Sequence, residues 1–162
     1  MPTLQYDETM NDFRSPVGPA EKAQMRLLGL QKQPIVGFLA RMILKGWGVS
    51  IPPATYSVPP FLPHVGTIVI HEKTRLGRNV TIFHNVTVGR GNIWTGPRSD
   101  FSGFTIEDNV VLCAGATILN SQGTLTVGAG TVIGANAVLT QSTGQNEVWA
   151  GNPARIIKKN IS

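Results

Sequence analysis

The sequence predicts an all-β fold: a β-solenoid of hexapeptide repeats, preceded by a short helical N-terminal segment. An aliphatic residue returns every six positions, at Ile70, Leu76, Ile82 and Val88, then at Ile106, Leu112 and Ile118, and again at Val127, Ile133 and Leu139. A half-buried strand would repeat every two residues and an amphipathic helix about every 3.6. Stacked short strands, each turning an aliphatic side chain inward, account for the six-residue period.

Composition and length favour the same fold class. The chain has 162 residues, enough for one domain with a continuous core. Only 14% of the residues are charged, while eighteen are glycine and eleven are proline. This balance is typical of turn-rich β structure and less so of a helical bundle.

Residues 1–50 are expected to form an arm and two short helices. Residues 1–19 are polar with several prolines, which predicts an extended arm. Residues 20–28 predict a first helix that Gly29 ends, and residues 35–47 predict a second. The second helix has one apolar stripe, formed by Ile35, Phe38, Leu39, Met42, Ile43 and Gly46. It is expected to cap the solenoid or contact another subunit, with peripheral membrane contact as the alternative.

The solenoid domain is assigned to residues 51–162. Five prolines make residues 51–63 an extended connector that delivers the chain into the repeats at His64. Residues 89–105 are rich in Gly, Asn, Pro and Ser and are expected to leave the wall as a loop. Residues 119–126 carry three residues more than one hexapeptide and predict a smaller loop or bulge. Insertions of this kind often lie on the binding face.

Charge and cysteine content narrow the functional classes. The net charge is +5 and the pI about 9.8, but no run of basic residues is interleaved with aromatics, which argues against nucleic-acid binding. The single Cys113 excludes an internal disulfide framework. The first twenty residues lack the apolar run of a signal peptide, so a cytoplasmic protein is expected.

The candidate chemistry lies in three histidines, His64, His71 and His84. With three hexapeptides in a coil, residue 64 lies beneath residue 82, which puts the backbones of His64 and His84 on the order of 8 Å apart. Both imidazoles can then face one cleft, where an imidazole can take a proton from an attacking alcohol. His71, beside Glu72, is expected to be structural.

Other sites are less favoured by the sequence. A zinc site is disfavoured because no two of the three histidines are a whole number of coils apart, so no metal is expected. Cys113 stands far from the histidines along the repeats, without an evident base, and is expected to be a packing residue. The tail bases Arg155, Lys158 and Lys159 are suited to phosphate groups.

Three motifs together resemble a known family. They are Pro63–His64–Val65–Gly66–Thr67–Ile68–Val69–Ile70, Phe83–His84–Asn85–Val86–Thr87–Val88–Gly89 and Gly151–Asn152–Pro153–Ala154–Arg155–Ile156. With the repeats, they are similar to serine acetyltransferases and to the related enzymes that O-acetylate polysaccharides, including the colanic acid type. The resemblance runs from about Ile51 to Lys159.

The resemblance implies a left-handed parallel β-helix, a homotrimer with sites between subunits, and acetyl-CoA as donor. It implies that His64 is the catalytic base and that His84 is the histidine of the polysaccharide-type motif. It also implies the residues that meet the donor, which are Gly89, Ala114, Ala135, Arg155 and Lys158.

The departures from serine acetyltransferases bear on the acceptor. Their Asp before the base is Pro63 here, their Arg–His pair is Ser102–Gly103, and the acid supporting the base is Ser50. Groups that would pair with the charges of free serine are missing, so a sugar or polysaccharide hydroxyl is the expected acceptor. Asn85, Trp94 and Arg98 are its candidate contacts. Serine is the alternative acceptor, and a non-catalytic scaffold is the alternative outside this class.

Overall fold

The computed structural model describes residues 18–92 and 100–161. Two helices, α1 (Pro19–Leu30) and α2 (Val36–Gly46), precede the strands, and a 3-10 turn, η2 (Pro53–Thr55), follows the first strand. The strands are β1 (Val49–Ser50), β2 (Ile68–Ile70), β3 (Thr74–Leu76), β4 (Thr81–Ile82), β5 (Val86–Arg90), β6 (Phe101–Ile106), β7 (Val111–Leu112), β8 (Thr117–Asn120), β9 (Gly123–Val127), β10 (Val132–Ile133), β11 (Val138–Leu139), β12 (Glu147–Ala150) and β13 (Arg155–Lys159).

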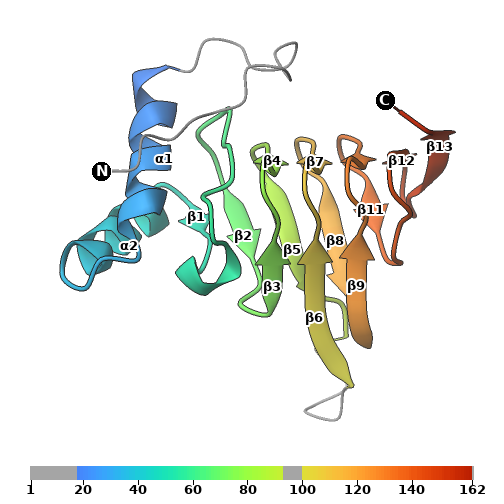
Figure 1. Ribbon diagram of the computed structural model, residues 1–162, viewed down its shortest axis with the longest axis horizontal. Helices are drawn as coiled ribbons and strands as arrows, with labels where there is room; N and C mark the ends of the chain where they lie inside the picture. Colours follow the sequence, from blue (N-terminus) through green and yellow to red (C-terminus); the bar gives the residue numbers. More distant parts are fainter. Residues whose placement is uncertain (1–17, 93–99, 162) are drawn as a thin grey trace.

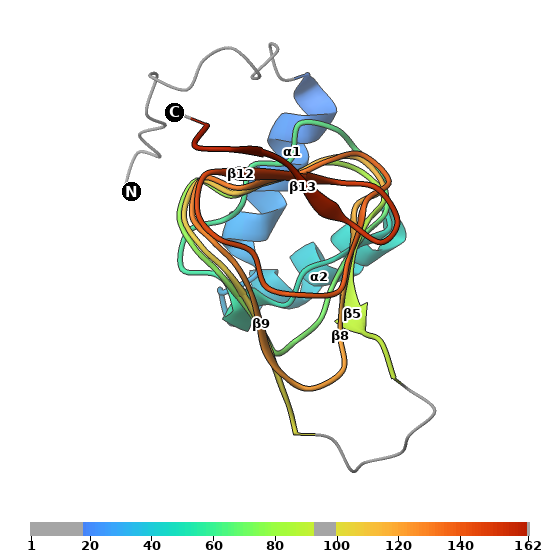
Figure 2. The ribbon, with the colours of Figure 1, turned by 90° about the vertical axis from the view of Figure 1, so that its right-hand side faces the viewer.

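These strands build the three walls of a left-handed parallel β-helix. Figure 1 shows the solenoid from the side, and Figure 2 shows it end-on. One wall has the order β1-β2-β5-β8-β11, the second β13-β12-β10-β7-β4 and the third β3-β6-β9. Only β12 and β13 pair in antiparallel fashion among the described strands. The predicted fold class is confirmed.

The aliphatic residues that recur every six positions form the inward face of the coils. Ile70, Leu76, Ile82 and Val88 are all buried, and so are the later members of the series. Ile68 pairs with Val86, eighteen residues on, so three hexapeptides make one coil. Asparagine occupies several corners with positive φ, as at Asn79 and Asn109, and these two side chains hydrogen-bond at 3.3 Å.

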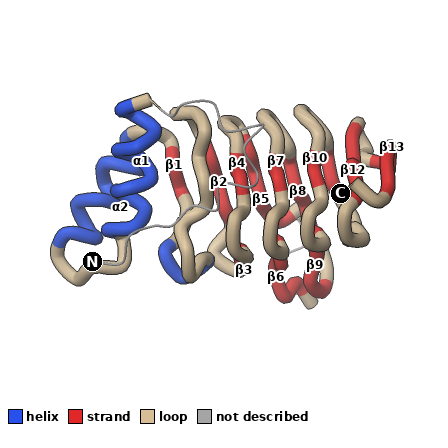
Figure 3. The backbone as a smooth tube through the Cα atoms, turned by 45° about the horizontal axis from the view of Figure 1, so that its top comes forward, coloured by secondary structure: helices blue, strands red, loops and turns tan. Residues whose placement is uncertain are grey.

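Both predicted loops are shorter than expected because strands continue into them. Residues 101–105, assigned to the first loop, belong to strand β6, and most of residues 119–126 belong to β8 and β9. β6 and β9 pair with each other from Phe101 to Ile106. They extend below the body of the solenoid (Figure 3). The extra residues of two successive coils thus pair their backbone N–H and C=O groups with each other.

The solenoid also begins earlier than residue 64. β1 pairs with β2 through Val49 and Ile68, and isolated bridges join Tyr56 to Leu76 and Phe61 to Thr81. The proline-rich connector is therefore the first coil. Prolines are tolerated there because this coil has a neighbour on one side only, so fewer backbone N–H groups are needed.

The helices cover the N-terminal end of the solenoid, where α2 contacts β1 (Figure 1). α1 continues through Gly29 to Leu30, so the predicted end at Gly29 was wrong. α2 turns Gly37, Ala40 and Leu44 inward. The apolar stripe picked out in the sequence faces outward instead. Small residues at 37 and 40 let the helix backbone approach its neighbours closely, which explains the reversal.

Candidate functional site

Two histidines meet at one corner of the solenoid. His64 is exposed before β2, and His84 is half-buried in the turn between β4 and β5. Their ring centroids are 5.6 Å apart, with the ring planes inclined by 70°. Phe61 pairs with Thr81, twenty residues on, so the first coil carries two extra residues and His64 lies nearer to His84 than the predicted offset. The structure brings the two predicted histidines together.

Gly66 permits this approach, a role that was not predicted from the sequence. A Cβ atom at position 66 would lie 2.7 Å from the Cβ of His84, closer than real Cβ contacts. The N–H of Asn85 donates to the Thr67 carbonyl at 2.6 Å and fixes the two coils in this register. A glycine two residues after His64 is visible in the sequence. Its role could not be predicted, because it depends on which residue of the next coil stacks against it.

No carboxylate supports the histidine pair among the described residues. Neither imidazole takes part in the ion pairs found in residues 18–92 and 100–161, which are Arg78–Asp108 and Lys159–Glu147. Pro63 immediately precedes His64, and Ser50 lies in β1, paired with Val69. Within residues 18–92 and 100–161, the site is therefore a pair of imidazoles with no carboxylate in ion-pair contact.

Small residues continue the same corner toward the C-terminal end. The register of β4, β7 and β10 aligns His84 with Ala114 and Ala135 in successive coils. The N–H of Gly115 donates to the His84 carbonyl at 3.0 Å, and that of Asn136 to the Ala114 carbonyl at 2.9 Å. The side chains of Ala114 and Ala135 are short, so the backbone along this corner is open to an extended ligand.

The basic tail ends this corner. Arg155 pairs with Ala150 and Lys158 with Val148 across the β12–β13 hairpin, and both basic residues are exposed. Ala150 in turn contacts the position of Gly134, next to Ala135. The structure thus places Arg155 near the end of the small-residue corner, with Lys158 further along β13.

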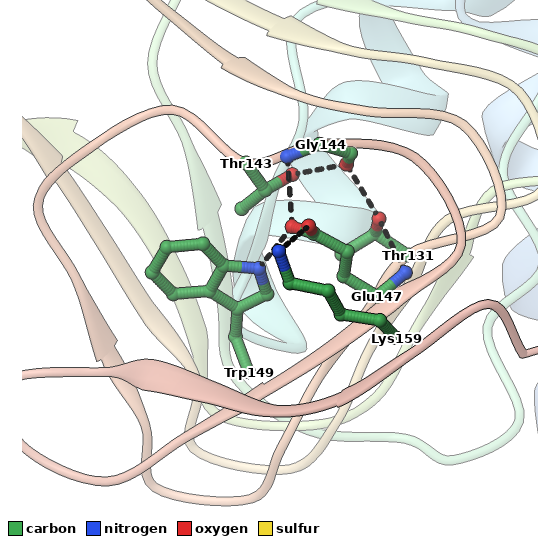
Figure 4. A network of polar contacts seen from close by, with 6 residues as sticks. All are labelled: Thr131, Thr143, Gly144, Glu147, Trp149 and Lys159. Atoms are coloured by element: carbon green, nitrogen blue, oxygen red, sulfur yellow. Dashed lines mark hydrogen bonds and ion pairs between the residues drawn. The ribbon is translucent and has the colours of Figure 1, made fainter.

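A buried carboxylate anchors the tail hairpin (Figure 4), and no sequence motif indicates it. Glu147 is only 8% exposed. Its Oε2 accepts hydrogen bonds at 2.8 Å from both the Gly144 N–H and the Trp149 indole N–H. Lys159 on β13 approaches Oε1 at 4.0 Å. The carboxylate thereby ties the turn before β12 to the two strands of the hairpin.

His71 and Cys113 have different surroundings. The Nδ1 atom of His71 accepts a hydrogen bond from the Lys73 N–H at 3.0 Å, and its ring packs edge-on against Phe101 at 5.1 Å. Cys113 lies one coil above Phe83, so its predicted distance from the histidines was wrong. Burial raises the pKa of the Cys113 thiol, which keeps it protonated and poorly nucleophilic.

The remaining candidates are dispersed. Gly89 lies near the end of β5, away from the corner that holds His84, and Asn85 adjoins His84 with a positive φ of 59°. Trp94 and Arg98 lie outside the described residues. No group of three metal-ligating side chains converges in the part of the chain that the structure describes.

Comparison with known proteins gives one consistent group of relatives. The chain is 34% identical over 128 residues to a serine acetyltransferase of Bacillus subtilis, covering 76% of this chain and 56% of the relative. It therefore spans little more than half the length of that protein. No protein-family model matches the chain.

Solved structures agree. A serine acetyltransferase from Brucella abortus in complex with coenzyme A superposes with a TM-score of 0.62 at 30% identity, covering 87% of this chain and 55% of that one. A serine acetyltransferase from Neisseria gonorrhoeae in complex with serine gives a TM-score of 0.59 at 27% identity, covering 86% and 54%. In its hexapeptide repeats and in its fold, the chain is serine acetyltransferase-like.

Proposed function

We propose that this chain transfers an acetyl group from acetyl-CoA to a hydroxyl group. The observation that carries the proposal is the His64–His84 pair, with ring centroids 5.6 Å apart, at the start of a corner lined by small residues. The serine acetyltransferase relatives, one of them solved with coenzyme A, support the same reaction class.

His64 acts as the general base. Its imidazole takes the proton of the acceptor hydroxyl as the oxygen attacks the thioester carbonyl. The tetrahedral intermediate then collapses, the carbon–sulfur bond breaks, and His64 returns the proton to the CoA sulfur. The products are an acetyl ester and free CoA, without an acyl-enzyme. An imidazole suits this exchange because it titrates near neutral pH.

His84 orients the acceptor or donates a hydrogen bond to the oxyanion. The extended arm of the donor lies along the open backbone at Ala114 and Ala135. Arg155, and with it Lys158, faces the donor's phosphate groups at the end of this corner, since a guanidinium binds phosphate bidentately. Gly89 lies apart from this path and is the weakest of the proposed donor contacts.

Serine is the first candidate acceptor, in place of the sugar that the sequence alone favoured. The relatives reported above are serine acetyltransferases, and one neighbour is in complex with serine. A carbohydrate hydroxyl is the second candidate. It is favoured by Pro63 before the base and by Ser102–Gly103 on β6, which supply no charges to free serine.

A homotrimer with sites between subunits is part of the proposal. The side chains of Val65 and Val69 are 41% and 42% exposed close to His64. Apolar groups beside a site that is open to solvent are suited to cover by another copy, which would also exclude water from the reaction.

Replacement of His64 tests the mechanism. His64→Ala is expected to lower turnover by about 10²–10⁴-fold, because the general base is lost, while the far-UV spectrum and thermal midpoint stay near those of the wild type. His71→Asn is the control. Its amide oxygen can replace Nδ1 as the acceptor for the Lys73 N–H, so turnover should persist. Wild-type turnover in His64→Ala would overturn the assignment.

An acceptor screen separates the two candidates. Release of free CoA is followed with L-serine, simple sugars and nucleotide sugars. Faster release with L-serine is expected, and release with a sugar alone would reassign the acceptor but keep the reaction. The scaffold alternative predicts no change in thermal midpoint at millimolar CoA, whereas a ligand of the native state raises the midpoint.

A further inference from the structure

The outer face of α2 is apolar and open to solvent. Ile35 is 82% exposed, and Phe38, Leu39 and Met42 are each 58% exposed. Ile43 adjoins them at 45%. Spacings of three and four residues place these side chains on one side of the helix, opposite the buried Gly37, Ala40 and Leu44. Single exposed apolar residues are ordinary, but a contiguous face of this kind marks an interaction surface.

Basic side chains flank this face. Residues 18–47 hold five basic residues, Lys22, Arg26, Lys32, Arg41 and Lys45, against one acid, Glu21. Two of the five are engaged by the fold: Lys32 donates to the Tyr56 carbonyl, and Arg41 donates to the Gln31 carbonyl at 3.0 Å. Arg41 and Lys45 lie one turn apart along the edge of the apolar face, each within a turn of Phe38 or Met42. The partner of this surface must therefore combine apolar groups with negative charge.

A groove between α1 and α2 adjoins the face. It is an open groove of about 650 Å³, lined by Lys22 and Arg26 on α1 and by Ile43 and Trp47 at the end of α2. Its two bases stand one helical turn apart over an apolar floor. Such a groove fits an amphiphile whose anionic head group meets the bases while its chain follows the apolar residues.

We propose that the outer face of α2 binds an anionic lipid surface. The apolar side chains enter the boundary between head groups and acyl chains, and the flanking bases Lys22, Arg26 and Lys45 pair with lipid phosphates. The charge around this face favours a lipid surface over a second copy of the chain paired about a two-fold axis. In a two-fold pairing of this face, Arg41 and Lys45 would lie near their own copies, and like charges would repel.

The binding is peripheral. Neither described helix is long and apolar enough to cross a membrane. The surface lies at the opposite end of the solenoid from the tail hairpin that carries Arg155 and Lys158 (Figures 1 and 3).

Vesicle flotation tests the proposal on the full chain. The wild type is expected to float with vesicles of phosphatidylcholine and phosphatidylglycerol, and less with phosphatidylcholine alone. Binding to the mixed vesicles should weaken as salt rises. Phe38→Ser/Met42→Ser should weaken it by about tenfold or more, since two exposed apolar side chains leave the contact. Lys22→Glu/Arg26→Glu should abolish the preference for the anionic vesicles.

Matched controls at the other end of the solenoid exclude general stickiness. Ile156→Ser/Ile157→Ser removes exposed apolar groups from β13, and Arg155→Glu/Lys158→Glu reverses two bases there; both should float like the wild type. Absence of flotation by the wild type, or equal loss in the controls, would overturn the proposal. So would a fall in molecular mass by light scattering for Phe38→Ser/Met42→Ser without any vesicle binding, which would assign the face to a second copy.

Discussion

At the scale of single residues, the absence of one side chain sets the distance between the two imidazoles. Gly66 stacks against His84, and only hydrogen occupies the place where a Cβ would meet the next coil. Because a general base must lie within hydrogen-bond reach of its substrate, we expect small shifts of this backbone to alter the proposed catalysis more than stability.

Substitution of Gly66 measures this effect. Gly66→Ala would put a Cβ 2.7 Å from that of His84, so one coil must shift by several tenths of an ångström. We expect turnover to fall by about 10–100-fold and stability by about 1–3 kcal/mol. Gly29→Ala is the control, since a Cβ there meets no atom within 4 Å and an alanine favours the helix. Unchanged turnover in Gly66→Ala would show that the spacing of the histidines is unimportant.

At the scale of elements, the tail hairpin depends on one buried acid. Glu147 satisfies two buried donors, the Gly144 N–H and the Trp149 indole N–H, each at 2.8 Å. The hairpin carries Arg155 and Lys158, so the network is coupled to the proposed donor site through the position of β13.

Glu147→Ala should lower the free energy of unfolding by about 2–4 kcal/mol, because two donors lose their acceptor in a buried place. Glu147→Gln keeps one acceptor oxygen and should cost less. Lys159→Ala should cost under about 1 kcal/mol, since its ammonium is exposed and 4.0 Å from the carboxylate. Urea unfolding of the three variants measures the order. Equal losses for Glu147→Ala and Lys159→Ala would show that the ion pair, and not the donors, matters.

At the scale of the whole molecule, the helices are tied to the solenoid by Tyr56. Its side chain lies in the first coil, and its hydroxyl donates to the Leu28 carbonyl of α1 at 2.8 Å. Lys32 also donates to the Tyr56 carbonyl. Burial raises the pKa of Tyr56 to about 12. The phenol must be protonated to donate this hydrogen bond, and in the unfolded chain it loses its proton at a lower pH than in the native protein.

The sign of the pH dependence follows from this pKa. Between about pH 10 and 12 the native phenol keeps its proton while the unfolded one loses it, so stability is full below pH 10 and falls as pH rises. Tyr56→Phe should cost about 1 kcal/mol at neutral pH and should lose this part of the alkaline decline. Urea midpoints at pH 9 and 11 for both proteins test it; an identical decline would contradict it.

Much of the fold was predictable from local pattern. The aliphatic series from Ile70 to Leu139 repeats along the chain whatever lies beside it, so the solenoid, its core and its coil length followed from the sequence. His64 and His84 stood out for the same reason, as imidazoles placed within that pattern. The extents of the loops were wrong because β6 and β9 pair with each other, which neither segment reveals alone.

The sequence by itself therefore determined the repeat, the inward residues and the two histidines of the candidate site. Tertiary structure alone decided which residues of different coils stack, because stacking depends on how many residues each coil carries. It placed Gly66 against His84 and Cys113 beside the same corner, and it buried Glu147. It also turned the Phe38 face of α2 outward, because α2 is apolar on both sides and only packing shows which side is covered.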